Sequence, residues 1–289
     1  MTTPATSTTS TTSTAATAAT EPTGPNPPAD VVRYEVREPG IALVTLNRPE
    51  RLNAWNPELD AAYFASLDRA VADPAVRVIV VTGAGAGFCA GADMDMLQSL
   101  GAGARSSGDR AGAGRPQHVT TTVPKPVIAA INGACAGIGL VQALMCDLRF
   151  AAAGATFTTA FVRRGLIAEH GISWILPRLV GTARALDLLL SGRVVLAEEA
   201  AAMGLVNEVV APEHLLDRVL EYAADLAVNC SPTSMSIIKQ QVHHDQLRDI
   251  GAASEDALEL MKASLRRSDF REGVASYLER RPPHFAPLA

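Results

Sequence analysis

The chain has 289 residues and a formal net charge of −5, from 30 acidic residues against 25 Lys and Arg, and 48% of its residues are hydrophobic. That apolar share is enough for a substantial buried core, in one large domain or two small ones. The mild negative charge without a basic stripe gives no indication of nucleic-acid binding, and no window approaches the apolar length that crosses a bilayer.

The first 28 or so residues are mainly Thr, Ser, Ala and Pro, with Glu21 as their single charged residue. Such a segment buries too little apolar surface to offset the entropy of ordering, so a disordered tail is predicted over residues 1–28. The segment also lacks the basic and apolar regions of a signal peptide, and its lack of Arg argues against a transit peptide.

Strands and helices are predicted to follow from Val31 onwards. Alternating apolar residues predict strands over 32–36 and 41–46, separated by a turn. Asn56 and Pro57 are typical of a helix start, as cap and first helical residue. The fully apolar run Val78 to Val81 is typical of a buried parallel strand.

A second unit repeats this plan, with a strand over 127–131, a turn over 132–139, a helix over 140–145 and a further strand over 148–151. Strands that alternate with helices indicate an α/β fold with right-handed crossovers. Between the units, residues 100–115 are rich in Gly, Ala, Ser and Arg, which predicts a mobile loop near the site.

The chain is predicted to be wholly helical after about Pro212. The candidate helices cover residues 213–228, 232–246, 255–267 and 270–280. We therefore divide the chain into a tail over 1–28, a core over 29–211 and a helical C-terminal region over 212–289.

The four cysteines are dispersed and show no metal-ligand spacing; they are Cys89, Cys135, Cys146 and Cys230. Their apolar or Gly/Ala-rich surroundings favour buried, reduced thiols rather than a nucleophile. We therefore expect a reducing, cytoplasmic location and no metal site. His243 and His244 are expected on a solvated helix face.

Two Gly-rich turns, residues 87–93 and 132–139, come where a strand gives way to a helix. Backbone N–H groups are free at such positions, so two adjacent turns can direct two donors at one oxygen, as an oxyanion hole requires. Either turn alone more often serves tight helix–strand packing. Neither matches a phosphate loop or a dinucleotide-binding fingerprint.

Taken together, six short motifs indicate a protein family more specifically than either turn alone. They are residues 47–54 (NRPERLNA), 88–93 (FCAGAD), 124–133 (PKPVIAAING), 146–147 (CD), 204–206 (GLV) and 279–281 (ERR). From about Val31 to Phe285, the chain resembles the crotonase (enoyl-CoA hydratase/isomerase) superfamily.

The resemblance implies a spiral of β-β-α units followed by helices that mediate trimers or dimers of trimers. It implies an acyl-CoA substrate in acyl-CoA or fatty acid metabolism, and no cofactor beyond the coenzyme A of the substrate. The thioester carbonyl is expected between the N–H groups of Ala92 and Ile138. Contacts to CoA are implied for Arg51, Ala54, Ala90, Asp93, Tyr277 and Arg280. Asp95 stands where a second basic residue is common.

The usual pair of hydratase glutamates is missing, because their positions match Val141 and Phe161, which are expected to line the pocket. Glu169 remains, at a position that resembles the third acid of dienoyl-CoA isomerases and the nucleophile of 4-chlorobenzoyl-CoA dehalogenases. Its apolar flanks predict partial desolvation and a raised pKa. Glu169 is therefore the expected acid/base of an isomerase-type proton transfer. His170 could orient this acid or only begin the next helix.

Three alternatives remain open from the sequence. Glu169 could be the nucleophile of a hydrolase or a dehalogenase-like enzyme. It could instead only cap the following helix. The loss of both standard acids would also suit a paralogue that binds acyl-CoA without turning it over.

Overall fold

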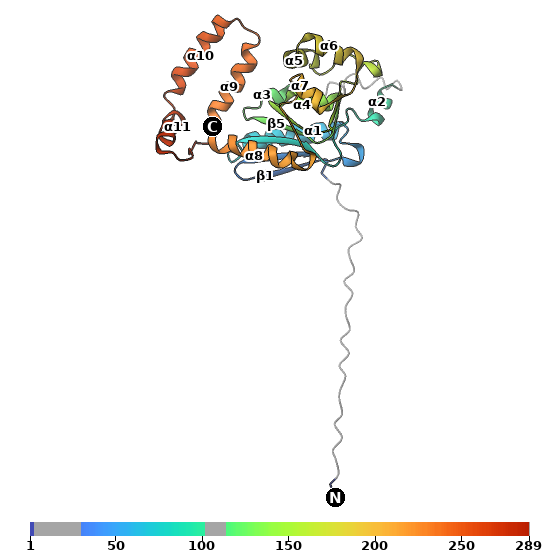
Figure 1. Cartoon of the computed structure of the whole chain (residues 1–289), viewed down its shortest axis with the longest axis horizontal. Helices are drawn as coiled ribbons and strands as arrows, with labels where there is room; N and C mark the ends of the chain where they lie inside the picture. The colour runs from blue at the N-terminus through green and yellow to red at the C-terminus, as the bar shows by residue number, and fades with distance from the viewer. Residues whose placement is uncertain (3–29, 102–113, 289) are drawn as a thin grey trace.

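A computed structural model describes residues 1–2, 30–101 and 114–288 of the chain. The predicted tail and most of the predicted loop over 100–115 lie outside these ranges. Figure 1 shows a layered body of strands and helices, with a helical arm to one side.

A six-stranded sheet forms the centre of the body, with strand order β1-β2-β3-β5-β7-β10. Only β1 is antiparallel to its neighbour, and the other pairs are parallel. The strands are β1 Val32–Arg37, β2 Ile41–Leu46, β3 Val78–Gly83, β5 Val127–Ile131, β7 Leu148–Ala152 and β10 Glu208–Val210. The continuous apolar runs of β2, β3 and β5 are almost wholly buried, as parallel strands covered on both faces require. The strands predicted at these places are confirmed.

A second, four-stranded sheet has the order β4-β6-β8-β9. Its strands are β4 Gly87–Cys89, β6 Ala134–Ala136, β8 Thr156–Thr158 and β9 Val195–Leu196. Two of them lie inside the Gly-rich segments that the sequence presents only as turns, and strands of two or three residues leave no readable period. Strands β3, β5 and β7 are each followed by a short strand and then by a helix, which is the expected β-β-α repeat.

The helices of the body follow the strands in chain order. They are α1 Pro57–Ala72, α2 Met94–Gly101, α3 Val119–Thr122, α4 Ile138–Met145, α5 Ile172–Val180, α6 Thr182–Ser191, α7 Ala197–Ala202 and α8 Leu215–Asn229, with short 3-10 turns η1 Pro49–Arg51, η2 Val162–Arg164 and η3 Pro212–His214. The predicted cap of α1 is confirmed, because the Asn56 side chain accepts a hydrogen bond from the Leu59 N–H at 2.8 Å. Helix α4 begins two residues before its predicted start.

Helix α8 packs against the six-stranded sheet and ends the body. The C-terminal arm follows, made of α9 Pro232–Asp245, α10 Ile250–Ser264 and α11 Ser268–Glu279 (Figure 1). Helix α10 begins five residues before its predicted start, because the Asp249 side chain caps it by accepting from the Ala252 N–H.

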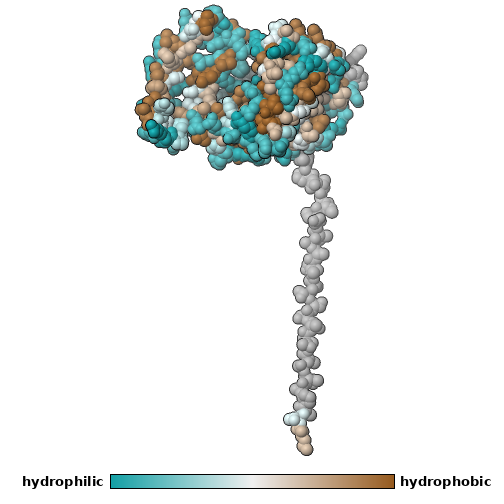
Figure 2. Space-filling view, in the orientation of Figure 1, coloured by the Kyte–Doolittle hydropathy of each residue, from teal (hydrophilic) through white to brown (hydrophobic). Residues whose placement is uncertain are grey.

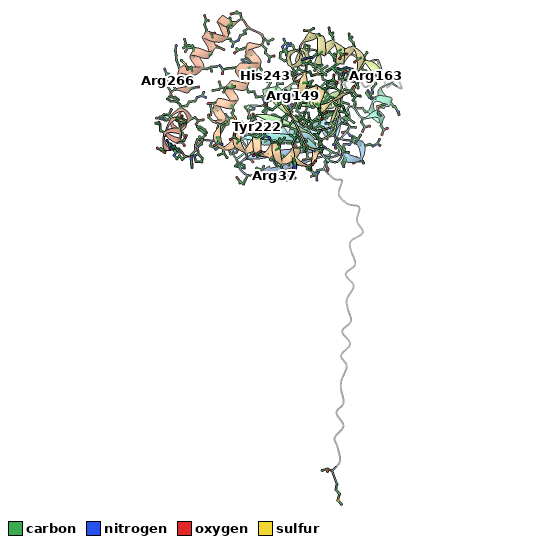
Figure 3. The ribbon with its side chains drawn as sticks, in the orientation of Figure 1. Arg37, Arg149, Arg163, Tyr222, His243 and Arg266 are labelled. Carbon is green, nitrogen blue, oxygen red and sulfur yellow. The ribbon has the colours of Figure 1, made fainter. Side chains whose placement is uncertain are left out.

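A partly buried ion pair links the arm to the body. The Lys239 ammonium on α9 lies 2.8 Å from the Asp147 carboxylate, which also accepts from the Val127 N–H at 2.7 Å. Asp147 therefore has a structural role just before β7, where it accepts from the start of β5 and pairs with the arm. His243 lies on the side of α9 that faces the body, whereas Arg266 stands on the far side of the arm (Figure 3).

Among the described residues, no helix combines the length and the apolar character needed to span a membrane.

Candidate active site

The two Gly-rich turns lie against each other because their short strands pair in parallel. Gly87 is opposite Ala134 and Cys89 opposite Cys135. A Cβ atom on Gly91 would lie 3.2 Å from the Ala136 carbonyl oxygen, and one on Gly137 would lie 3.8 Å from the Gly91 Cα. Both glycines have positive φ, 105° and 51°, which L side chains rarely adopt. Two chain segments about forty residues apart thus share one site.

The first candidate donor is the N–H of Ala92. Ala92 forms a parallel bridge with Trp55, in which the Trp55 N–H donates to Gly91 and the Asp93 N–H donates to Trp55. The neighbouring peptide groups therefore face Trp55, and the Ala92 N–H faces the other way. Among the described residues, this N–H has no backbone acceptor.

The second candidate donor is the N–H of Ile138, the first residue of α4. The first N–H groups of a helix have no acceptor within the helix, and no backbone acceptor is found for this one in the described part of the chain. All eight residues of α4 are buried, so its positive end lies in a low-dielectric setting. The next residue, Gly139, allows the helix to approach the first turn, because a Cβ there would lie 2.4 Å from the Cys89 carbonyl oxygen.

The first turn is held by side chains to which the sequence alone gives no role. Arg48 lies 2.9 Å from the Asp93 carboxylate and also donates to the Ala54 carbonyl oxygen. The Arg48–Asp93 hydrogen bond is the main cause that lowers the pKa of Asp93 below its ordinary value. Asn53 is fully buried and donates to the carbonyl oxygens of Ala84 and Gly87 at 3.0 and 2.8 Å. Asn53 has a positive φ of 57°, a conformation that Asn tolerates better than most residues.

Glu169 lies between the η2 turn and α5. Its backbone carbonyl accepts from the Ile172 N–H, but Gly171 occupies the cap position of α5, and no side chain caps that helix. The interpretation of Glu169 as a side-chain helix cap is therefore wrong. The carboxylate lies 3.9 Å from His170 Nε2, and both side chains are about one-third exposed (34% and 35%).

Helix α4 connects Glu169 to the two turns. A Cβ on Gly171, two residues after Glu169, would lie 3.7 Å from the Cε of Met145, the last residue of α4. Ile138 is the first residue of the same helix, and the two ends are about 10 Å apart at 1.5 Å per residue. The acid segment and the two candidate N–H donors thus border opposite ends of one short helix.

The positions of the missing glutamates are apolar and buried. Val141 on α4 is 0% exposed and Phe161 is 6% exposed, and both belong to the main core cluster. Neither side chain can transfer a proton. Their contact with an acyl chain remains a prediction.

The residues expected at CoA fall into two groups in space. Arg51, Ala54, Ala90 and Asp93 lie around the first turn, where the Ala90 N–H donates to the Leu52 carbonyl oxygen at 3.0 Å. Tyr277 and Arg280 lie at the end of α11, on the opposite side of the molecule from α2 (Figure 1). Arg51 is exposed and pairs with Asp95 at 3.2 Å. One chain therefore does not bring the two groups together.

Two of the four cysteines, Cys89 and Cys135, lie on the paired short strands of this site. Cys89, Cys135 and Cys146 are buried and unpaired, as predicted, whereas Cys230 is only half-buried. Burial raises the pKa of Cys89 and of Cys146 to about 12. A thiol with so high a pKa is a poor nucleophile at neutral pH.

The family model of enoyl-CoA hydratase/isomerase matches residues 36–287 of the chain. The chain is 36% identical to the 1,2-epoxyphenylacetyl-CoA isomerase of Escherichia coli, over 86% of this chain and 95% of that protein. It is 38% identical to a "probable enoyl-CoA hydratase" of Rhodobacter capsulatus, over 88% of this chain and 97% of that protein.

Solved structures give the same result. An enoyl-CoA hydratase from Mycobacterium marinum is 59% identical, with a TM-score of 0.66 over 76% of this chain and all of that one. An enoyl-CoA hydratase/isomerase from Mycobacterium abscessus is 32% identical, with a TM-score of 0.83 over 89% of this chain and all of that one.

Proposed function

The chain belongs to the enoyl-CoA hydratase/isomerase family of enzymes, and on this basis we propose that it shifts a double bond in an acyl-CoA thioester through an enolate, with Glu169 as the acid/base. One observation carries the mechanism. Two adjoining turns present the N–H groups of Ala92 and Ile138 without backbone acceptors in the described chain.

These two N–H groups bind the thioester oxygen. Removal of an α- or γ-proton places negative charge on that oxygen, and the two donors together with the start of α4 stabilise the charge. The donors gain strength as the charge develops, so they lower the barrier more than they tighten substrate binding. No side chain is needed for this step, and the Ile side chain at 138 leaves the N–H intact.

Glu169 moves the proton. A single carboxylate can take a proton from one carbon and return it to another, whereas adding water usually requires a second group to hold and deprotonate that water. Because Val141 and Phe161 occupy the usual acid positions, the isomerase reaction fits the chain better than hydration. The comparisons do not favour the hydrolase, dehalogenase or binding-only alternatives.

We further propose that the enzyme is cytoplasmic. Coenzyme A enters as part of the substrate, and no other cofactor takes part in the reaction. The arm of one subunit packs on another in a trimer or a dimer of trimers. This assembly is supported by exposed apolar side chains along the arm, among them Ile250, Tyr277 and Leu278 at 83%, 83% and 73% exposed (Figure 2).

The test is mass spectrometry of the protein with a panel of enoyl- and acyl-CoA esters in deuterated water. Wild type is expected to place deuterium in the unchanged or isomerised thioester. In Glu169→Gln this exchange should fall by about 10²–10⁴-fold, the usual contribution of a positioned acid/base. Glu198→Gln, an exposed acid in the first turn of α7, is the matched control and should exchange like wild type.

Other products would change the assignment. Net addition of water would make the enzyme a hydratase, and release of free CoA would make it a hydrolase. Binding of thioesters without exchange or reaction in wild type would contradict the catalytic proposal.

A further inference from the structure

The four residues from Glu169 to Ile172 form one tight turn at the start of α5. The Ile172 N–H donates to the Glu169 carbonyl oxygen at 3.1 Å. The central residues His170 and Gly171 have φ of 54° and 82°, and ψ of Gly171 is 10°. A hydrogen-bonded turn with positive φ at both central positions is characteristic of type I′. The backbone that carries the Glu169 side chain is therefore fixed to the start of the helix.

His170 is an unusual residue for the first central position of this turn. Type I′ turns favour Asn, Asp or Gly there, because positive φ costs most other residues free energy. The helix does not require the imidazole either, since Gly171 occupies the cap position of α5 and no side chain caps that helix. Residues held in sparsely populated conformations cluster at functional sites. The turn therefore indicates a role for the His170 side chain itself.

The imidazole of His170 lies beside the Glu169 carboxylate. Nε2 is 3.9 Å from Oε2, and the two side chains are 35% and 34% exposed. Among the described residues, His170 is the sole ion-pair partner of this carboxylate, and it approaches Oε2 rather than Oε1. The distance exceeds that of a hydrogen bond, but hydrogen bonds to catalytic groups are commonly longer before substrate binds and tighten in the complex. One carboxylate oxygen thus has a donor beside it.

Resting on the proposed function, we propose that His170 is a positioning residue, whose Nε2–H donates to Glu169 Oε2 and leaves Oε1 to move the proton. A partly exposed glutamate side chain samples several rotamers, and only those that direct an oxygen at the acyl carbon can react. The hydrogen bond selects among these rotamers, while the turn fixes the backbone from which they start. Because this acts on the orientation of the acid and not on substrate affinity, it affects kcat and leaves KM unchanged.

The test compares His170→Gly, His170→Asn and His170→Gln in kcat and KM for deuterium exchange into enoyl-CoA esters. Gly and Asn suit the left-handed backbone best, but only the longer Gln side chain places an amide N–H where the imidazole Nε2 lies. We expect kcat to fall about tenfold in His170→Gly and His170→Asn, with KM within about twofold, and His170→Gln to stay within about threefold of wild type. His214→Asn, at an exposed histidine on η3, is the control and should exchange like wild type.

The order of the three variants separates positioning from a backbone role. If His170 serves only the turn, His170→Gly and His170→Asn should equal or exceed wild type, and His170→Gln should be the slowest. That order would overturn the proposal and leave the proposed function standing. Urea denaturation of each variant shows whether a lower kcat comes from the folded protein.

A second measurement needs no turnover and is made by NMR on protein with isotope-labelled histidine and a bound saturated acyl-CoA. The His170 Nε2 signal, identified by its loss in His170→Gln, is expected to shift in Glu169→Gln and to stay unchanged in Glu198→Gln. A signal that does not respond to Glu169→Gln would overturn the proposal, even where wild type exchanges deuterium. If the signal responds but wild type exchanges nothing, the proposed function fails, and the pair is then structural, which also overturns the positioning role.

Discussion

The two sides of the candidate active site are built differently. The oxyanion side is made of backbone that packs too closely to admit side chains, as at Gly139 and Gly91, and α4 is wholly buried. The acid side is a loop in which Ile167 is 78% exposed, and among the described residues the Glu169 carboxylate has no partner closer than His170 at 3.9 Å. In the proposed mechanism, the groups that stabilise charge are therefore fixed by the packing of the fold. The acid lies on an exposed loop, so a change of the acid should not disturb that packing.

This difference predicts that a change on the oxyanion side affects folding and chemistry together. The largest effect is expected for Gly139→Ala, whose Cβ would lie 2.4 Å from the Cys89 carbonyl oxygen and 2.6 Å from its Cβ. Helix α4 must move away, which should destabilise the protein by about 3 kcal/mol. Because the Ile138 N–H moves with it, kcat should fall at least about a hundredfold.

Urea denaturation at fixed protein concentration and deuterium exchange measure the two effects. Gly273→Ala in α11 is the control, since its Cβ would meet only Phe285 at 3.8 Å. It should stabilise the protein by about 0.5–1 kcal/mol. A Gly139→Ala variant with the stability and activity of wild type would remove the distinction between the two sides.

The second prediction concerns pH and the Arg48–Asp93 pair, whose side chains are 15% and 9% exposed. The pKa of Asp93 is lowered in the folded protein, so the pair contributes stability above the ordinary Asp pKa of 3.8, and this contribution is lost as pH falls through the lowered value. Asp93→Asn should cost about 1.5–3 kcal/mol at neutral pH and flatten the acid limb of the stability curve. If the free energy of unfolding of Asp93→Asn falls with pH as steeply as that of wild type, other carboxylates cause the loss of stability in acid.

The sequence predicts the long strands, the capped start of α1 and the two turns, because their periods, cap and glycines are local signals. It does not predict β4, β6, β8 and β9, whose two or three residues pair only through contacts distant in the chain. For the same reason Arg48 and Asn53 receive no role from sequence.

A smaller effect is expected at the surface of the first turn. Arg51 and Asp95 are 54% and 71% exposed and lie 3.2 Å apart, so Asp95→Asn should change stability by about 0.5 kcal/mol or less. If Arg51 binds a CoA phosphate, the same variant should lower KM for CoA esters, most clearly at low salt. Steady-state kinetics across a salt series would show this, and an unchanged KM would argue that Arg51 does not contact the substrate.

The smallest effect on stability is expected on the acid side itself. Within the described part of the chain, the Glu169 side chain makes no hydrogen bond and does not cap α5, and 34% of it is exposed, so Glu169→Gln removes little that holds the fold. Its free energy of unfolding should remain within about 0.5 kcal/mol of wild type, although exchange is expected to collapse. Urea denaturation of the two proteins side by side is the measurement. A loss of stability similar to that of Gly139→Ala would mean that Glu169 belongs to the packed framework, and its loss of activity could then no longer be assigned to proton transfer.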